Sequence, residues 1–168
     1  MVCVACRCVF LLHCGCAVLY SGAAVNLSRV GLNLIEGFES CRLIAYTDSG
    51  GKWTIGWGYT GPDVHAGLVW TQAQADAALF ARTAIAEHVV NIGVRVNLMQ
   101  CRFDALCSLT YNIGGRAFLN SSLLRYLNLQ DWAAASEQFM VWDMVDGKQS
   151  ADLLQRRTVE RAFFDLAG

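Results

Sequence analysis

Three polar side chains, Glu39, Asp48 and Thr54, stand close together in a segment that is otherwise rich in apolar residues. Two carboxyl groups and a hydroxyl around one cleft suit the cleavage of a glycosidic bond. One carboxyl group would donate a proton to the leaving oxygen, which requires an apolar site, while the other stays ionised and the hydroxyl holds a water molecule. Each residue alone also has a common structural explanation, as a helix end, a turn former or a strand residue.

The residues around these three predict a helix followed by a β-hairpin. Ser28 is typical of an N-cap and apolar residues follow it at helical spacing, so we expect a helix over 29–39. Residues 43–60 are rich in Tyr, Thr, Trp and Ile, and the turn sequence Asp-Ser-Gly-Gly interrupts them at 48–51. They predict a hairpin, with room for a third short strand, that folds the three polar residues toward one another.

The rest of the chain predicts helices. We expect five, over 72–91 after the capping box Thr71–Gln74, from a cap at Asn97 to Gly114, from Ser121, from Asp131 with helical spacing as far as Trp142, and over 151–166 after the turn Asp146-Gly147. The fold class is therefore α+β, with a small hairpin sheet near the N-terminus and a mainly helical lobe.

Composition limits the function classes. The chain has 168 residues, of which 55% are apolar and 16% are charged, so most of it should fold as one domain with a short appendage. Its 13 basic and 14 acidic residues provide no basic surface for nucleic acid. We expect a monomer that needs neither cofactor nor metal.

The N-terminal segment differs from the rest. Residues 1–28 carry one formal charge, Arg7, and residues 8–25 form an uncharged run. As a helix this run would span roughly 27 Å, close to the thickness of a bilayer core. It is compatible with a cleaved signal peptide, with an uncleaved signal anchor that later leaves the bilayer, or with a buried helix. We divide the chain into this segment, 1–28, and a catalytic domain, 29–168.

Cysteines are concentrated in the same segment. Five of the eight lie within residues 1–16, and the other three are Cys41, Cys101 and Cys107. The N-terminal spacings hint at a metal site, but without a second matching cluster downstream the zinc signal is weak. Apolar packing explains these cysteines more simply.

The stretch from Phe38 to Gly58 resembles the phage-type (T4-like) lysozymes, glycoside hydrolase family 24. That family has Glu, eight residues, Asp, five residues, Thr and then Ile-Gly-x-Gly, and the three polar residues match this spacing. Further segments are similar to the family downstream: Thr110 to Gly114, Ala117-Phe118 with Ser121 to Leu124, and Gln155-Arg156-Arg157 with Glu160-Arg161. The resemblance covers residues 29–166.

The resemblance implies a lysozyme-like fold and an endolysin that lyses the host by hydrolysing the β-1,4 bond between N-acetylmuramic acid and N-acetylglucosamine in peptidoglycan. Glu39 would be the proton donor, Asp48 would assist the attacking water or stabilise the developing positive charge, and Thr54 would position that water. A water between acid and sugar implies inversion at the anomeric carbon. Four further residues match positions that line the saccharide cleft: Thr60, Tyr111, Asn112 and Ser121.

Two other functions remain open, namely a lytic transglycosylase and a membrane-tethered module that binds glycan without cutting it. Glu36 is a rival acid one helical turn before Glu39, but its separation from Asp48 does not fit the family spacing. Departures from the family pattern occur at Ser40, Thr47, Tyr59 and Ala151-Asp152. These departures are expected to affect catalytic efficiency more than reaction type.

By the same resemblance, residues 8–25 are similar to a signal-arrest-release segment, a weak anchor that is held at the host inner membrane and leaves it when the membrane potential collapses. The protein would be exported, and anchored in the inner membrane, periplasmic, or both. Some such relatives couple release to a disulfide switch, which here would join Cys41 to Cys14 or Cys16. We therefore expect oxidation state or membrane attachment to gate the cleft.

Overall fold

The computed structural model describes residues 18–19, 25–48 and 50–167. The predicted N-terminal segment, with the cysteines before residue 17, therefore lies largely outside the described residues. Within the described part, helices account for most of the chain: α1 (Arg29–Phe38), α2 (Gln72–Gly93), α3 (Gln100–Ile113), α4 (Gly115–Leu119), α5 (Ser122–Asn128), α6 (Trp132–Glu137), the 3-10 helix η2 (Gln138–Trp142) and α7 (Ala151–Asp165).

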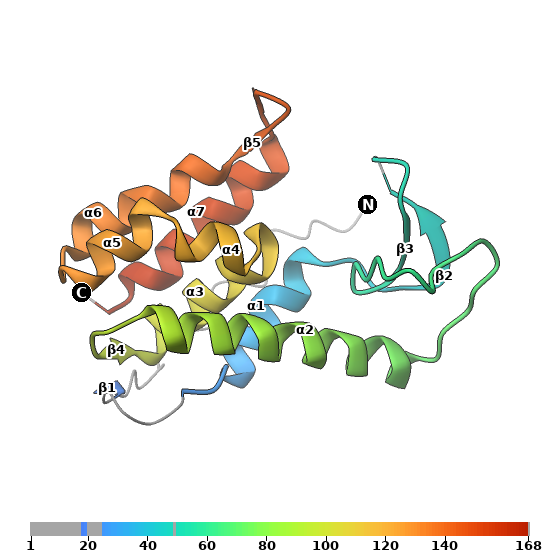
Figure 1. The fold of residues 1–168 in the computed structure, drawn as a ribbon, viewed down its shortest axis with the longest axis horizontal. Helices are drawn as coiled ribbons and strands as arrows, with labels where there is room; N and C mark the ends of the chain where they lie inside the picture. Colours follow the sequence, from blue (N-terminus) through green and yellow to red (C-terminus); the bar gives the residue numbers. More distant parts are fainter. Residues whose placement is uncertain (1–17, 20–24, 49, 168) are drawn as a thin grey trace, which may run out of the picture.

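The described strands form three separate antiparallel pairs: β1 (Val18–Leu19) with β4 (Leu98–Met99), β2 (Arg42–Thr47) with β3 (Trp53–Gly56), and β5 (Met144–Val145) with β6 (Lys148–Gln149). Figure 1 shows two lobes: the β2–β3 hairpin lies at one end of the long helix α2, and the other helices gather toward its opposite end. The predicted α+β class is confirmed.

The β2–β3 hairpin has the predicted turn and an irregular register. Tyr46 pairs with Thr54 and Thr47 with Trp53, while the register shifts between Arg42 and Tyr46. No third strand joins this pair among the described residues. Two isolated bridges, Ile44 with Val69 and Ile55 with Tyr59, cover its edges instead.

Helix α3 forms the centre of the helical lobe. Each of its residues from Cys101 to Tyr111 is buried. It packs against α1, α2, α4 and α7. Burial of this kind supplies the main driving force for folding, at roughly 25 cal/mol per Å² of apolar surface. At the far end of α3, Tyr111 donates to the carbonyl of Trp57 and the side chain of Asn112 accepts from Arg157 of α7.

The helix caps are mostly those that the sequence predicts. The side chains of Ser28, Ser121 and Asp131 accept the expected backbone hydrogen bonds, and Thr71 and Gln74 complete the capping box. The predicted cap at Asn97 is wrong, because α3 begins at Gln100. The two residues before it, in β4, are extended and pair with β1, so the helix starts later.

The helix predicted from Asp131 to Trp142 is shorter than expected. Helix α6 ends at Glu137 and the chain continues as the tighter η2. There Phe139 is fully buried and its ring lies 5.4 Å from that of Phe164 on α7. Tertiary packing here overrides the local helical spacing.

Residues 25–28 are bound to the helical lobe. Val25 exchanges two backbone hydrogen bonds with the Asn91 side chain, and the Leu27 amide donates to Glu87. Ser28 donates to Asp104 through both its amide and its hydroxyl. Among the helices of the described ranges, none is long and apolar enough to cross a membrane.

Candidate active site

Glu39 lies at the junction of the two lobes. It is the first residue beyond α1, and its amide donates to the carbonyl of Ile35 at 3.1 Å. Its side chain, 19% exposed, accepts a hydrogen bond at Oε1 from Arg156 Nη1 of α7 at 2.9 Å. The carboxyl group is thus mostly buried and paired with a cation, rather than surrounded by apolar groups alone.

The second carboxyl oxygen of Glu39 lies against the backbone of Gly58. A Cβ atom on Gly58 would lie 3.1 Å from Glu39 Oε2, and φ of this glycine is +77°. Both features exclude an ordinary side chain, because a residue with a Cβ atom is strained at this φ and would press on the acid. This close approach gives a physical reason for the second glycine of the Ile-Gly-x-Gly motif.

A buried group of charges on α7 supports Arg156. Glu160 is fully buried, accepts from Ser108 Oγ at 2.6 Å and from Arg156 Nε at 3.0 Å, and pairs with Arg157 at 2.8 Å. Arg157 also donates to the side chain of Asn112. We call Arg156, Arg157 and Glu160 the buried charge cluster. It ties the proposed acid to the last helix and, through Asn112, to α3.

Asp48 and Thr54 lie together within the hairpin. Asp48 Oδ1 accepts from the amides of Gly50 at 2.9 Å and Lys52 at 2.8 Å. Its Oδ2 lies 3.5 Å from Thr54 Oγ1, which also donates to the carbonyl of Lys52 at 3.1 Å. The carboxylate and the hydroxyl are therefore adjacent, as hydrolysis would require.

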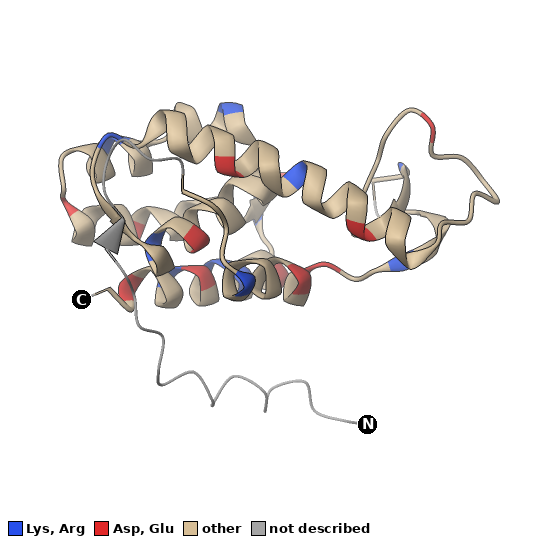
Figure 2. Cartoon of the chain, turned by 90° about the horizontal axis from the view of Figure 1, so that it is seen from below, with Lys and Arg blue, Asp and Glu red and all other residues tan. Residues whose placement is uncertain are grey.

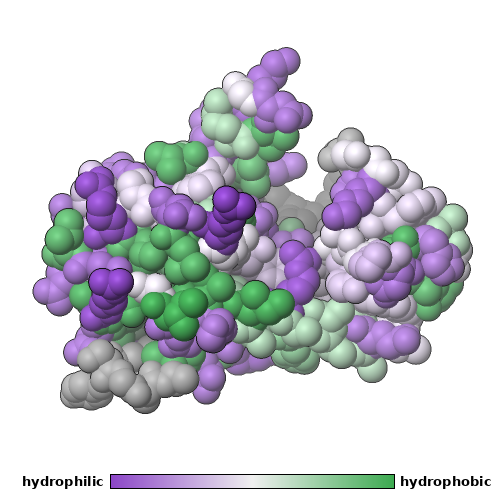
Figure 3. Space-filling view, viewed as in Figure 1, coloured by the Kyte–Doolittle hydropathy of each residue, from purple (hydrophilic) through white to green (hydrophobic). Residues whose placement is uncertain are grey.

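The structure brings Asp48 and Thr54 together and separates their contacts from those of Glu39. Glu39 contacts α7, whereas the other two contact each other and the hairpin backbone. Figure 3 shows a hollow between the helical lobe and the hairpin lobe. The rival acid, Glu36, instead pairs with Arg29, which lies two turns earlier on the same face of α1, at 3.9 Å.

The four residues predicted to bind saccharide have different surroundings. Tyr111 is buried and donates to the carbonyl of Trp57 at 3.1 Å. Burial raises the pKa of its phenol to about 12. Asn112 is exposed at the end of α3, and Thr60 is half-buried beyond β3. The hydroxyl of Ser121 caps α5 and donates to the carbonyl of Phe118 at 2.7 Å.

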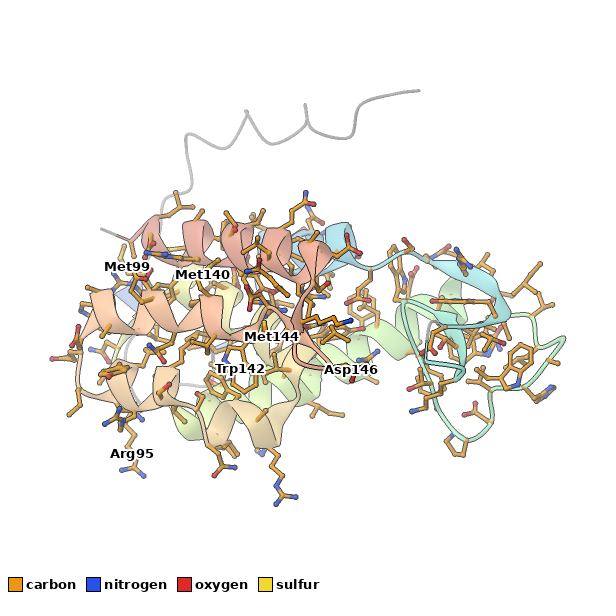
Figure 4. All side chains as sticks on the ribbon, turned by 90° about the horizontal axis from the view of Figure 1, so that it is seen from above. Arg95, Met99, Met140, Trp142, Met144 and Asp146 are labelled. Carbon is orange, nitrogen blue, oxygen red and sulfur yellow. The ribbon has the colours of Figure 1, made fainter. Side chains whose placement is uncertain are left out.

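An open pocket of about 600 Å³ adjoins Ser121. It is lined by Ile113, Gly114, Arg116, Ala117, Asn120, Ser121, Ser122 and Trp142. In Figure 4, Trp142, Met144 and Asp146 follow one another toward the hairpin lobe. The pocket combines an indole ring with hydroxyl and amide groups, which suits a polar ligand that has apolar faces.

Sequence reasoning missed the side chains that hold the acid. It placed Arg156 only in a matching motif and gave it no role beside the acid. Arg156 bonds Glu39 across 117 residues, a separation at which no local pattern signals a contact. The pair of arginines followed by Glu160 was the available signal, since helical spacing places oppositely charged side chains within reach of one another.

The predicted cysteine switch falls largely outside the described residues, because Cys14 and Cys16 are not among them. Cys41 is half-buried on the chain between Glu39 and β2, and its sulfur lies 3.7 Å from the amide nitrogen of Gln72. Cys101 and Cys107 are buried within α3. In the described ranges, no group of His, Cys, Asp or Glu side chains is arranged to hold a metal ion.

The sequence is similar to one protein family and to several named relatives. Residues 36–160 match the family model described as phage lysozyme. An endolysin of Acyrthosiphon pisum secondary endosymbiont phage 1 is 41% identical over 147 residues, which are 85% of this chain and 100% of that protein. A SAR-endolysin of Enterobacteria phage P21 is 34% identical over 148 residues, covering 86% of this chain and 90% of the relative.

Solved structures of phage endolysins and lysozymes have a similar fold. The endolysin from Escherichia coli O157:H7 phage FAHEc1 superposes with a TM-score of 0.79 at 36% identity, covering 84% of this chain and 94% of that one. A variant of P22 lysozyme superposes with a TM-score of 0.72 at 40% identity, covering 83% and 98% of the two chains.

Proposed function

Because the chain belongs to the phage lysozyme family and is a glycoside hydrolase of the lysozyme type, we propose that Glu39, Asp48 and Thr54 catalyse its reaction. The proposed substrate is the glycan of peptidoglycan, cut at the β-1,4 bond between N-acetylmuramic acid and N-acetylglucosamine, and the result is lysis of the host. One observation carries the assignment. Glu39 is held at the lobe junction by Arg156, while the hairpin holds a carboxylate beside a hydroxyl.

The proposed mechanism assigns each group one task. Glu39 donates its proton to the glycosidic oxygen as the bond to the anomeric carbon breaks, so that the leaving sugar departs as an alcohol. A water next to Thr54 attacks the anomeric carbon from the opposite face, and Asp48 takes a proton from that water. The product then has the inverted anomeric configuration.

Substitution of Glu39 tests this proposal, and Glu36 provides a matched control on the same helix. We expect Glu39→Gln to abolish clearing of purified peptidoglycan, because the amide cannot donate the required proton, while binding to sedimented cell walls is retained. Glu36→Gln should clear at the wild-type rate. Clearing by Glu39→Gln at a wild-type rate would refute the assignment.

Binding of saccharide forms a second part of the proposal. Thr60, Tyr111, Asn112 and Ser121 would line the cleft, and Ser121 opens onto the pocket that contains Trp142. The lytic transglycosylase and the non-cutting glycan-binding module are not favoured by the relatives, which are named endolysins. Products with anhydro-muramic ends would identify the transglycosylase.

We further propose that residues 1–28 tether an exported protein to the host inner membrane and that residues 29–168 form the catalytic domain. The uncharged run at 8–25 and several relatives named SAR-endolysins support this proposal. Fractionation of a host that expresses the full chain should recover the protein in the inner membrane and the periplasm. Recovery from the cytosol alone would contradict export.

A further inference from the structure

We infer that Arg82 is a positioning residue for the reaction: together with Tyr111, it holds the Trp57–Gly58 backbone against the acid Glu39. The inference rests on the proposed function, because it gives Arg82 a role through Glu39. Arg82 is the single arginine of α2, where Figure 2 shows one basic segment between two acidic ones.

Two side chains from different helices bind two consecutive carbonyls of the hairpin lobe. Arg82 Nη1 of α2 donates to the carbonyl of Gly58 at 2.8 Å, and the Tyr111 hydroxyl of α3 donates to the carbonyl of Trp57 at 3.1 Å. The first is a charge-assisted hydrogen bond, which is roughly twice as strong as a neutral one. The chain just beyond β3 is thereby bound to the helical lobe at two adjacent points.

Arg82 and Tyr111 also restrain each other. The guanidinium carbon of Arg82 lies 4.3 Å from the centroid of the Tyr111 ring, which is within the range of a cation–π contact. Stacking on the ring fixes the plane of the guanidinium group and hence the direction of its hydrogen bond. The Tyr111 phenol is protonated at neutral pH even at its ordinary pKa of about 10, and burial raises this pKa to about 12, so the second hydrogen bond persists over the whole neutral range.

The backbone that these two residues hold lies against the acid. An atom at the Cβ position of Gly58 would lie 3.1 Å from Glu39 Oε2 and 3.8 Å from Arg82 Nη1, so both side chains border this glycine. Arg156 restrains the acid at Oε1, and the Trp57–Gly58 backbone, which Arg82 holds, restrains it at Oε2. The carboxyl group is therefore positioned from both lobes.

Loosening the Trp57–Gly58 backbone next to Glu39 should affect the chemical step more than substrate binding. Proton transfer needs the acid within hydrogen-bonding reach of the leaving oxygen, and a displacement of about 1 Å can cost on the order of 100-fold in rate. Arg82 bonds the backbone and stacks on Tyr111. Its loss should accordingly lower kcat and leave KM almost unchanged.

The test uses the full chain and soluble, peptide-free glycan strands, with kcat and KM measured separately. We expect Arg82→Met to lower kcat about tenfold with less than about a twofold change in KM, because methionine keeps the apolar stem and loses the hydrogen bond. Arg82→Lys should restore part of kcat through its own charged donor. Tyr111→Phe, which keeps the ring and removes the hydroxyl, should lower kcat in the same direction.

Arg95→Gln provides the control, since Arg95 is exposed at the end of the helical lobe far from the hairpin (Figure 4). It should leave both constants unchanged, and thermal unfolding of each variant shows whether it folds. Wild-type kcat in folded Arg82→Met, or an effect confined to KM, would overturn the inference. If the wild-type protein cleaves no glycan, the proposed function itself fails, which is a distinguishable result.

Discussion

Replacing Glu160 by glutamine tests how far the buried charge cluster stabilises this fold. Glu160 is fully buried and contacts two arginines that are at most 7% exposed at their side chains. Burial lowers the pKa of Arg157, and the charge of Glu160 opposes this effect. The variant keeps the size of the side chain but leaves two buried cations with one anion fewer.

The contacts of Glu160 indicate how much stability the variant should lose. Breaking a buried ion pair by removing one partner costs about 3–5 kcal/mol. Arg156 keeps its bond to Glu39 and Arg157 keeps its bond to Asn112, so we expect the lower end, about 3 kcal/mol in the free energy of unfolding. For a chain of this size that corresponds to a decrease in Tm of roughly 6–12 °C.

Urea and thermal unfolding measure this loss, and Glu137→Gln is its matched control. Glu137 also pairs with an arginine, Arg161, at 2.5 Å, but its side chain is 64% exposed. An exposed pair contributes at most about 1 kcal/mol, so the control should unfold almost like the wild type. Equal unfolding free energies for the two variants would show that burial does not make the Glu160 charge indispensable.

Three further outcomes are expected. Gly58→Ala should reduce peptidoglycan clearing at least tenfold more than Gly147→Ala, because both glycines have φ of +77° but only the first would place a Cβ atom against Glu39; equal effects would contradict the proposed contact. In the native protein the Cys107 thiol, whose pKa burial raises well above its usual value, should resist maleimide and react only after denaturation, as peptide mapping would detect. Burial also raises the pKa of Asp104, so the contribution of this carboxyl group favours folding at low pH and is lost as pH rises through the folded pKa. In urea unfolding, the stability advantage of the wild type over Asp104→Asn should therefore be larger at about pH 4 than at pH 7. An advantage that grows with pH would contradict this expectation.

Local signals in the sequence predicted much of the fold. Caps such as Ser28 and the Thr71–Gln74 box depend on hydrogen bonds within three residues, so their patterns can be read directly from the chain. The Asp-Ser-Gly-Gly turn likewise predicted the hairpin. The failure at Asn97 has a non-local cause, because pairing with β1, some eighty residues earlier, keeps the chain extended before α3.

In the candidate site, too, local patterns could be predicted and long-range contacts could not. Motif spacing selected Glu39, Asp48 and Thr54, and the hairpin explains why the last two meet. No spacing rule could reveal that Arg156 binds the acid or that Arg82 binds the carbonyl of Gly58. These contacts depend on how the helical lobe packs against the hairpin lobe, which only the tertiary structure specifies.

In the proposed mechanism, Glu39 protonates the glycosidic oxygen while a water near Asp48 attacks the sugar. Digestion of purified peptidoglycan in water enriched in a heavy oxygen isotope, followed by mass spectrometry of the products, tests it most directly. We expect labelled reducing ends on N-acetylmuramic acid from the wild-type protein and no cleavage by Glu39→Gln. Unlabelled anhydro ends, or labelled products from the Glu39 variant at the wild-type rate, would contradict it.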